Sequence, residues 1–415
     1  MANRMSPLPA GGEGHFFQGL PKQYRTDTSM RVAIYVPHGA VPDKRGFAPA
    51  IVAWNHARRL KAATPLIISA REHYPNAHEI VEGVPVYRIG EGRLYRRVFR
   101  KMTRLDPYPL HRRAAKIVNR EAPDLFHAHQ LEFPVADFLG ALGRKIPVIV
   151  HAHVTAARFD EKHGIADRYL AVSRHVRDRL ITEKNFPPAR VEVLPNGVDT
   201  QLFSPPQAGE RENLRRAWQV PPDAVVVAFV GRMQEVKGFH VFLKVVERAL
   251  ARFKSLYVIA VGPEPEDSKR ETTYSQRREI RQKLRAGGAY VEHPAVPHAE
   301  LARILKMTDI VLVPSLNEPQ GMVMLESMAC GCITISSNRE GIKESVEHGK
   351  TGFLLDHPDN PDEALAQLED VIRRLDSLGN LRHAARQAAV TRFDWNAVTA
   401  QLEAIYLEVM RKRGA

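Results

Sequence analysis

Two successive series of apolar strands and helical stretches run along this chain, and they constrain its fold more than any other feature. The first series begins with RVAIYVP at 31–37 and ends with VEVLPNGVD at 191–199. The second begins with AVVVAFVGR at 224–232, after a polar, proline-containing linker at 202–214. Apolar strands that alternate with helices are typical of parallel sheets with helices on both faces. The sequence therefore predicts an α/β protein with two doubly wound parallel-sheet domains.

The domain boundaries follow from the linker and from the two ends of the chain. We expect a loose, Gly- and Pro-rich extension over 1–29, a first domain over 30–203 and a second domain over 204–392. The helical segment 393–415 is expected to pack back on the first domain. Met30 stands directly before the first strand, so the chain could also start there. Because no secretory signal and no run of about 18 apolar residues is found, we expect a cytoplasmic protein.

The basic charge of this 415-residue chain is concentrated in its first half. The formal net charge is +13, and residues 1–200 carry 31 Lys or Arg against 19 Asp or Glu. Such a field favours an anionic partner, for example a membrane surface, an acidic glycan or nucleic acid. Cys330 and Cys332 are too few for a disulfide framework or for the four ligands of a structural zinc site. We expect them to be small buried thiols.

Candidate ligand-binding residues lie where predicted strands end, which is where ligands of such sheets bind. The stretch NEPQGMVMLESMACG, 317–331, places Glu318 in a loop and Glu326 on a helix. Carboxylates accept hydrogen bonds from pairs of sugar hydroxyls, and a glycine before a helix lets backbone N–H groups approach an anion. GRMQEVKG supplies Arg232 and Lys237, cations suited to a diphosphate. Taken alone, the two glutamates could also be a capping residue and a solvated one.

Together these stretches resemble the retaining family 4 glycosyltransferases. The order GRMQEVKG, VGPEP, NEPQGMVMLESMACG and EGIKESVEHGKTGFLL is similar to that of the family, as are PNGVDTQLFSP and the late RFDWNAVTAQLEAIYLEV. The resemblance covers most of residues 31–410. It implies the GT-B fold, in which two Rossmann-like domains face a central cleft. It also implies a nucleotide diphosphate sugar as donor substrate, with a UDP-sugar favoured.

The resemblance implies a role for each motif of the second domain. Glu318 would contact the donor sugar, and Glu326 the ribose of the nucleotide. Arg232 and Lys237 would hold the diphosphate and stabilise its charge as the sugar leaves. The residues expected at the donor in this domain are Arg232, Lys237, Glu318, Gly321, Met322, Val323 and Glu326. No metal ion or cofactor is expected, and no D-x-D motif stands at a strand end in a donor-site context.

The first domain supplies the rest of the implied donor site. In the family a His that lines the donor sugar follows a strand, and PVIVHAHVT places His153 there. The family also carries a Gly-Gly pair after its first strand, whereas this chain has single glycines, of which Gly46 is the first candidate and Gly39 the second. The groups with an implied catalytic role are His153, Glu318, Arg232 and Lys237.

Three further histidines lie at the same strand ends, namely His127, His129 and His151. From the residues alone, a zinc site is one interpretation, because imidazole nitrogen is a common zinc ligand. With the resemblance, hydrogen bonding to sugar is favoured for His153, and structural or acceptor-facing roles for the other three. We therefore assign no metal ligand here.

The implied reaction is a retaining, metal-independent transfer of a hexose-type sugar. No carboxylate is a candidate nucleophile beneath the anomeric carbon, since Glu318 is expected at the hydroxyl side of the ring. We expect front-face attack, in which the departing phosphate takes the proton of the acceptor. The alternatives are a nucleotide-sugar epimerase of the same fold, which would need no acceptor, and an inactive glycan-binding subunit.

The stretch GRLYRRVFRKMTRL, 92–105, bears on the acceptor. At about 100° per residue its apolar and basic side chains fall on separate faces of a helix. The basic face consists of Arg93, Arg96, Arg97, Arg100, Lys101 and Arg104. Such a helix suits an anionic membrane surface, or it docks on its own domain with the cations in solvent.

These properties favour a glycan or lipid-linked acceptor in lipopolysaccharide or surface-polysaccharide synthesis, at the inner face of the cytoplasmic membrane. A soluble small-molecule acceptor that carries negative charge is the alternative. Nucleic acid is not expected as a partner, because no recognition motif or aromatic-rich basic platform is found.

Overall fold

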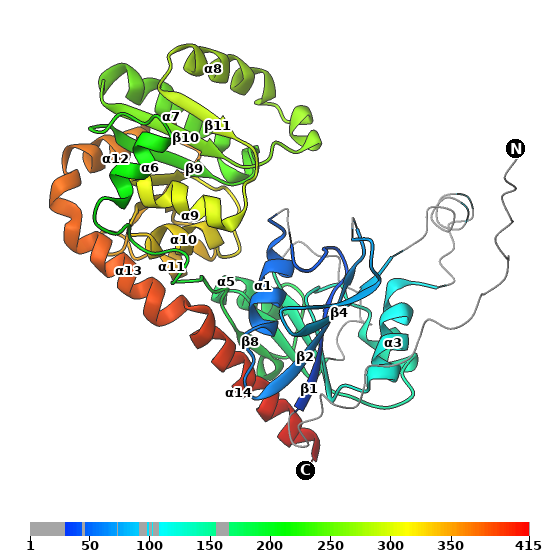
Figure 1. Cartoon of the computed structure of the whole chain (residues 1–415). Coiled ribbons are helices and arrows are strands. Elements are labelled where there is room, and N and C mark those ends of the chain that lie inside the picture. Colours follow the sequence, from blue (N-terminus) through cyan, green and yellow to red (C-terminus); the bar gives the residue numbers. More distant parts are fainter. Residues whose placement is uncertain are drawn as a thin grey trace, which may run out of the picture.

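The structure is a computed structural model and describes residues 30–43, 46–72, 74–90, 98, 102, 108–154 and 166–414. The described chain forms two lobes, each built around one sheet (Figure 1). The strand order is β3-β4-β2-β1-β5-β6-β7-β8 in the first sheet and β11-β10-β9-β12-β13-β14 in the second. Every pairing is parallel except that of β3 with β4. The predicted α/β fold with two doubly wound sheets is confirmed.

The first sheet is covered by helices on both faces. Its strands are β1 (Met30–Val36), β2 (Ala63–Ala70), β3 (His78–Val81), β4 (Val84–Ile89), β5 (Leu125–Ala128), β6 (Val148–Ala152), β7 (Arg168–Ala171) and β8 (Val191–Val193). Its helices are α1 (Ala48–Ala57), α3 (Leu110–Glu121), α4 (Val135–Gly140), α5 (Arg174–Thr182) and the 3-10 turn η4 (Pro188–Arg190). Helices α3, α4 and α5 share a core with one face, and α1 shares a core with the other. Sequence reasoning missed β3, an edge strand of four residues with none buried.

The second sheet is almost wholly buried. Its strands are β9 (Val225–Val230), β10 (Leu256–Val261), β11 (Tyr290–His293), β12 (Ile310–Val313), β13 (Ile333–Ser337) and β14 (Phe353–Leu355). Its longer helices are α6 (Glu210–Ala217), α7 (Phe239–Arg252), α8 (Tyr274–Ala286), α9 (His298–Met307), α10 (Met322–Ala329), α12 (Pro361–Arg373) and α13 (Gly379–Phe393). Shorter elements are α11 (Ile342–Ser345), η5 (Glu235–Lys237), η6 (Glu266–Arg270) and η7 (Leu375–Leu378).

Two details of this lobe bear on the predictions. The linker predicted over 202–214 is too long, because α6 begins within it and buries Leu214 while its first turn carries Glu210 and Glu212. Acidic residues favour a helix N-terminus through the helix dipole, and this signal outweighs the polar composition. Cys330 and Cys332 are free and buried, as expected.

The last helix, α14 (Trp395–Gly414), leaves the second lobe and lies along the first (Figure 1). Its residues Val398, Leu402 and Tyr406 are buried in the same core as strands β1 and β2. The crossing is tight, because a Cβ atom on Gly197 would lie 2.4 Å from the ring of Trp395. The last helix thus crosses from the second lobe and packs into the core of the first.

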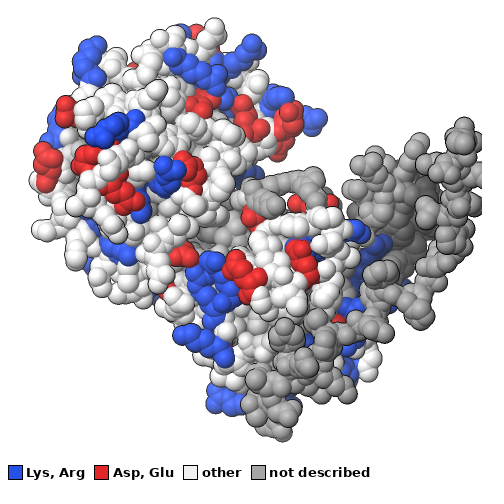
Figure 2. All heavy atoms as spheres, viewed as in Figure 1, with Lys and Arg blue, Asp and Glu red and all other residues white. Residues whose placement is uncertain are grey.

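Among the helices of the described residues, none is both long and apolar enough to cross a membrane. The six cations of the predicted basic helix lie outside the described residues, as does nearly all of the segment 92–105. The space-filling view shows a hollow between the two lobes (Figure 2).

Candidate functional site

Three loops of the second lobe meet at the carboxyl edge of its sheet, and glycines let them pack together. A Cβ atom on Gly262, after β10, would lie 1.9 Å from the carbonyl oxygen of Gly231, after β9. A Cβ atom on Gly238 would lie 1.9 Å from the carbonyl oxygen of Pro314, after β12. All three glycines have positive φ angles, of 147°, 150° and 69°, respectively. A side chain at Gly262 or Gly238 would collide with the neighbouring backbone. The glycines therefore allow GRMQEVKG to pack closely against the loops after β10 and β12.

This packing brings Lys237 and Glu318 together. The Lys237 ammonium donates to Glu318 Oε2, and the two side chains are 15% and 19% exposed. The Glu318 backbone N–H in turn donates to Glu340 Oε2 at 2.6 Å, and Asn317 Nδ2 donates to Glu340 Oε1 at 2.7 Å. The cation and the carboxylate predicted from the sequence therefore form one ion pair, on a loop that Glu340 holds from the turn after β13.

Helix α10 begins directly after this pair. Gly321 precedes the helix with a φ of 81°, and the backbone N–H groups of Met322 and Val323 belong to its first turn. Such first-turn N–H groups have no acceptor within their helix and can bind a sugar or phosphate oxygen. A Cβ atom on Gly321 would lie 3.2 Å from Glu318 Cγ, so the glycine also makes room for the carboxylate.

Glu326 lies on the same helix and has a partner that sequence reasoning missed. The residue is 5% exposed, and its Oε1 lies 3.5 Å from Nε2 of His298. The hydrogen bond and charge of Glu326 raise the pKa of His298 above its ordinary value. The signal in the sequence was the start of HAELARIL after a short strand, which places His298 at the same sheet edge as Glu326.

Arg232 lies on the same loop as Lys237 but is exposed, and within the described part of the chain its guanidinium has no hydrogen bond or ion pair. Arg277 holds this loop from the buried side. Its buried guanidinium donates to the carbonyl oxygen of Met233 at 2.5 Å and to Glu271 Oε2 at 2.8 Å. Nothing in its helix, α8, distinguishes Arg277 from neighbouring basic residues, so it could not be found from sequence.

The loop after β1 carries the two candidate glycines of the first lobe. Gly39 is packed, since a Cβ atom there would lie 2.4 Å from the Phe47 ring. Gly46 is exposed with a φ of 79°, has open space around it, and donates its N–H to Asp43 Oδ2 at 2.5 Å. The buried Arg88 holds the loop through the Val41 carbonyl oxygen at 2.9 Å. Of the two glycines, Gly46 is the one that another molecule can approach.

His153 directly follows β6, at the rim of the first lobe, and three further histidines lie beneath it. Its Nε2 is 3.1 Å from Nδ1 of His129. Burial lowers the pKa of His153, His129 and His127 well below the ordinary value, and lowers that of His151 to about 3. All four rings are therefore neutral near pH 7. No hydrogen bond or ion pair within the described residues joins His153 to the charged residues of the second lobe.

The lobes themselves are joined by carboxyl and amide contacts. Glu344 of α11 accepts the backbone N–H groups of Arg174 and His175, at 2.7 Å and 2.8 Å, at the start of α5. Gln320 Oε1, next to the ion pair, accepts the N–H of Asn196 at 2.6 Å. A cavity of about 550 Å³ lies at this junction. The position of the NEPQG loop is thus coupled to the first lobe.

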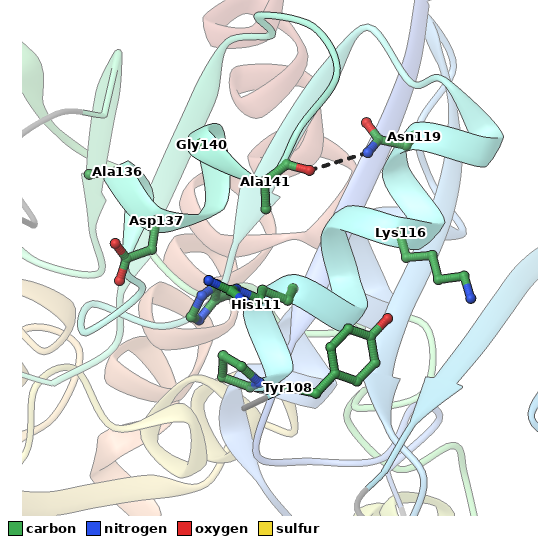
Figure 3. A pocket seen from close by; sticks show the side chains of 10 residues that line it. Tyr108, His111, Lys116, Asn119, Ala136, Asp137, Gly140 and Ala141 are labelled. Carbon is green, nitrogen blue, oxygen red and sulfur yellow. Dashed lines mark hydrogen bonds between the residues drawn. The ribbon is translucent and has the colours of Figure 1, made fainter. Parts of the chain in front are cut away.

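A second hollow, of about 990 Å³, lies on the first lobe between α3 and α4 (Figure 3). Its lining includes Arg112 and Lys116 from α3, with Asp137 from α4 on the opposite side. It adjoins the end of the predicted basic segment in the sequence. Two basic side chains of the first lobe, Arg112 and Lys116, thus line this hollow.

Comparison with known proteins decides the family. Residues 46–202 match the family described as "Glycosyltransferase Family 4", and residues 210–390 match "Glycosyl transferases group 1". A D-inositol 3-phosphate glycosyltransferase of Corynebacterium glutamicum is 30% identical over 309 residues, 68% of this chain and 72% of that relative. The chain belongs to the family 4 glycosyltransferases.

Other relatives of this glycosyltransferase differ in their named substrates. A D-inositol 3-phosphate glycosyltransferase of Thermobispora bispora is 33% identical over 258 residues, which span 60% of this chain but 57% of that relative. A lipopolysaccharide 1,2-N-acetylglucosaminetransferase of Salmonella typhimurium is 22% identical over 362 residues, 86% of this chain and 93% of that relative. The solved structure of Anabaena HepE with UDP and glucose has a TM-score of 0.73 at 19% identity, and covers 91% of this glycosyltransferase and 99% of HepE. The predicted family and GT-B fold are confirmed.

Proposed function

We propose that this glycosyltransferase moves a hexose-type sugar, with retention, from a UDP-sugar to a glycan or lipid-linked acceptor in lipopolysaccharide or surface-polysaccharide synthesis. The observation that carries the proposal is the Lys237–Glu318 ion pair, at a sheet edge that also holds Arg232 and the start of α10. This one edge offers cations for a diphosphate, a carboxylate for sugar hydroxyls, and backbone N–H groups for either.

The ion pair suggests how the donor would bind. The ammonium group of Lys237 would donate to the diphosphate as well as to Glu318. The Glu318 carboxylate would then be freer to accept hydrogen bonds from the sugar. Negative charge grows on the diphosphate as the sugar leaves, and a fixed cation at Lys237 stabilises it most in the transition state. The exposed Arg232 would add a second cation. With two cations in these positions, no metal ion is required at the diphosphate.

The nucleotide would lie against Glu326. A buried carboxylate is a suitable acceptor for two ribose hydroxyls, and Nε2 of His298, 3.5 Å from its Oε1, holds it in place. UDP is preferred as the nucleotide because HepE, of the same fold, was solved with UDP and glucose. His153 would line the sugar from the other lobe. Front-face attack remains the proposed course, with the departing phosphate taking the acceptor proton.

The acceptor is expected to carry negative charge, because the basic excess belongs to the first lobe. The similarity to a lipopolysaccharide transferase over most of both chains favours a lipid-linked acceptor. A soluble phosphorylated acceptor is the second candidate, favoured by the D-inositol 3-phosphate glycosyltransferases among the relatives. A peripheral position at the inner face of the cytoplasmic membrane would follow from the first candidate.

A two-step experiment tests the proposal. A thermal-shift panel of UDP-, ADP- and GDP-sugars identifies the donor, because the ligand that binds most tightly raises the Tm most at equal concentration. The donor is then incubated with lipid-linked glycan, with inositol phosphate and with no acceptor, each with and without a chelator. Transfer with retained anomeric configuration is expected both with and without the chelator. Conversion of the donor without any acceptor would instead indicate an epimerase, and a complete lack of turnover by folded protein would refute transfer.

A further inference from the structure

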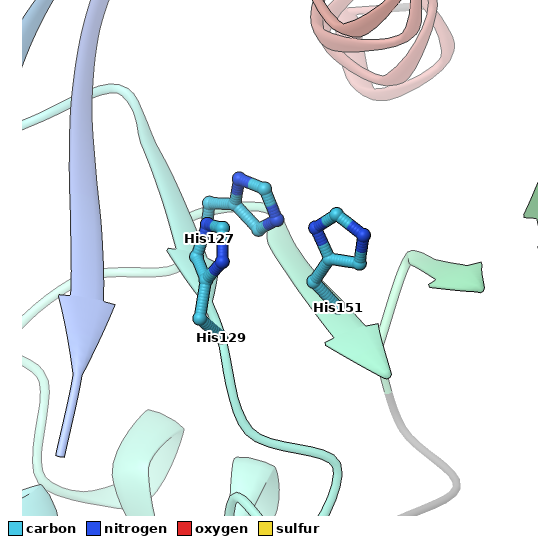
Figure 4. Close-up of side chains that lie close together, drawn as sticks. All are labelled: His127, His129 and His151. Carbon is cyan, nitrogen blue, oxygen red and sulfur yellow. The ribbon is translucent and has the colours of Figure 1, made fainter. Parts of the chain in front are cut away.

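A second group of chemically active side chains lies inside the first lobe. His127 and His129 come from the end of β5, and His151 comes from the neighbouring strand β6. The rings converge in Figure 4, and one possible ligand nitrogen of each lies within 4.8 Å of the other two. We infer that these three histidines bind a divalent transition metal ion of the zinc class, at a site separate from the proposed diphosphate site.

The rings are buried polar groups that lack protein partners on their facing sides. His127 and His151 are fully buried, and His129 is 3% exposed. Within the described residues, Nε2 of His127, Nε2 of His129 and both ring nitrogens of His151 have no hydrogen-bond partner. The backbone of Leu194 lies beside the ring of His151 and can engage only one of its two nitrogens, which leaves the other to a ligand. An unpartnered buried polar atom costs roughly 1–3 kcal/mol, so a cluster of them indicates a ligand.

The other nitrogens of two rings are held as in metal-bound histidines. His127 Nδ1 lies 2.7 Å from the hydroxyl of Tyr406 in α14. His129 Nδ1 lies 3.1 Å from Nε2 of His153. A ligating histidine ordinarily donates its second ring N–H to such a partner, which fixes the tautomer and leaves the lone pair on the opposite nitrogen. In both rings the opposite nitrogen is the unpartnered Nε2.

The distances require only a small closure of the three rings. Zinc–nitrogen bonds of 2.0–2.1 Å place tetrahedral ligand atoms about 3.3 Å apart. Here the nitrogens lie within 4.8 Å of one another, and the broad χ2 torsion of histidine lets a ring turn toward a shared ion. Three imidazole ligands suit Zn²⁺, Ni²⁺ and Cu²⁺ rather than Mg²⁺ or Ca²⁺, and they leave a fourth position for water.

The site also bears on His153, in so far as that residue lines the donor sugar as proposed above. When His129 ligates through Nε2, its Nδ1–H donates to His153 Nε2. His153 must then carry its own proton on Nδ1. A bound metal would thus select one tautomer of the donor-lining histidine without contacting the diphosphate.

The test uses the whole chain without an affinity tag, stripped by a chelator and titrated with Zn²⁺ and, separately, with Co²⁺. We expect one metal ion per chain after gel filtration, the visible absorption of tetrahedral Co²⁺, and a higher Tm with Zn²⁺. His151→Gln should weaken the metal affinity at least about 100-fold. Tyr406→Phe removes only the hydroxyl behind His127 and should weaken it about 10-fold, as outer partners of metal ligands do.

The matched control is His56→Gln. His56 is another fully buried histidine of the first lobe, with its Nδ1 2.9 Å from Thr399 Oγ1, but it is not part of the cluster. Its variant should bind the metal as the wild type does. The inference is overturned if the wild type retains no Zn²⁺ or Co²⁺, or if His151→Gln and Tyr406→Phe both bind like the wild type. Metal binding without sugar transfer would leave this site standing and refute the proposed function.

Discussion

The second lobe presents its candidate binding groups as charges at the rim of a sheet, whereas the first lobe encloses neutral histidines in its core. Lys237 and Glu318 neutralise each other while each remains partly accessible, so a charged ligand can exchange with either partner. His127 and His151 are fully buried, and burial itself keeps them uncharged. The comparison shows two ways to hold polar groups in a folded chain: pairing at the surface, or neutrality in the interior.

The largest expected effect tests the charged side of this comparison. Lys237→Met keeps an apolar stem but removes the cation proposed to stabilise the leaving diphosphate. We expect kcat for sugar transfer to fall about 10²–10³-fold, as when one stabilising donor is removed from a transition state. Steady-state kinetics with the preferred UDP-sugar measures this. Lys244→Met, farther along the same segment in α7, should keep wild-type kinetics, and a twofold or smaller loss in Lys237→Met would contradict the role.

The next prediction has a smaller expected effect. It distinguishes the residue proposed at the ribose of the donor, Glu326, from the residue proposed at its diphosphate, Arg232. Glu326→Gln removes a charged acceptor from the ribose and should raise the Kd for UDP about 10-fold, because a hydrogen bond to a charged group contributes about 1.5 kcal/mol. Arg232→Ala should act mainly on kcat. Calorimetric titration with UDP, together with kinetics, distinguishes them. Glu300→Gln on the neighbouring helix α9 is the control, and equal UDP affinity in Glu326→Gln and the wild type would remove Glu326 from the site.

The neutral, buried histidines of the first lobe predict that the folded protein loses stability in acid. Burial lowers the histidine pKa values in the folded state, to about 3 for His151, while the unfolded value is about 6.5. Between these values the unfolded chain binds protons that the folded chain does not, so stability falls as the pH falls. The loss is about 1.4 kcal/mol per pH unit for each such histidine, or about 2 kcal/mol at pH 5. Urea unfolding of chelator-treated protein from pH 7 to pH 5 measures it.

His151→Leu is the matched variant for this prediction. This variant lacks one titrating group. Its free energy of unfolding should therefore fall less steeply with decreasing pH, by the amount that one histidine contributes. An equally steep fall in both proteins, or no fall in the wild type, would show that the cluster is not held neutral.

The smallest effect concerns the contact between the lobes. Glu344→Ala removes the acceptor of two backbone N–H groups at the start of α5 and should lower the free energy of unfolding by about 1 kcal/mol, the usual cost of a lost cap. Ser173→Ala removes the cap that the same helix receives from its own lobe, a bond of 3.2 Å to the Val176 N–H, and should cost a similar amount. Only Glu344→Ala should also change the KM for the donor. Equal KM values in both variants would mean that this contact does not couple lobe position to binding.

The sequence was sufficient for the local parts of this molecule. The strands other than β3 were predictable because they are short apolar runs, and α7 because Phe239, Phe242, Leu243 and Val246 recur at helical spacing. The motifs around Lys237 and Glu318 were predictable because their residues lie in contiguous stretches with glycines at fixed places. The ion pair between these two residues was not predicted, although both loops end at one sheet edge.

Long-range partners could not be predicted in the same way. Arg277 and Glu340 support the loops that carry Lys237 and Glu318, yet each is an ordinary charged residue within its own segment. The partner of His127 is Tyr406, 279 residues away on α14. Such contacts depend on how the lobes and the last helix pack, and no local pattern carries that information.

The position of α14 also has a consequence for synthesis. A ribosome makes β1 first, yet the core around β1 includes Leu402 and Tyr406 from α14. The strands of the second lobe, from β9 to β14, are all complete before α14 emerges. The lobe that is translated first is therefore finished last, which reverses the usual order in which domains of a nascent chain fold.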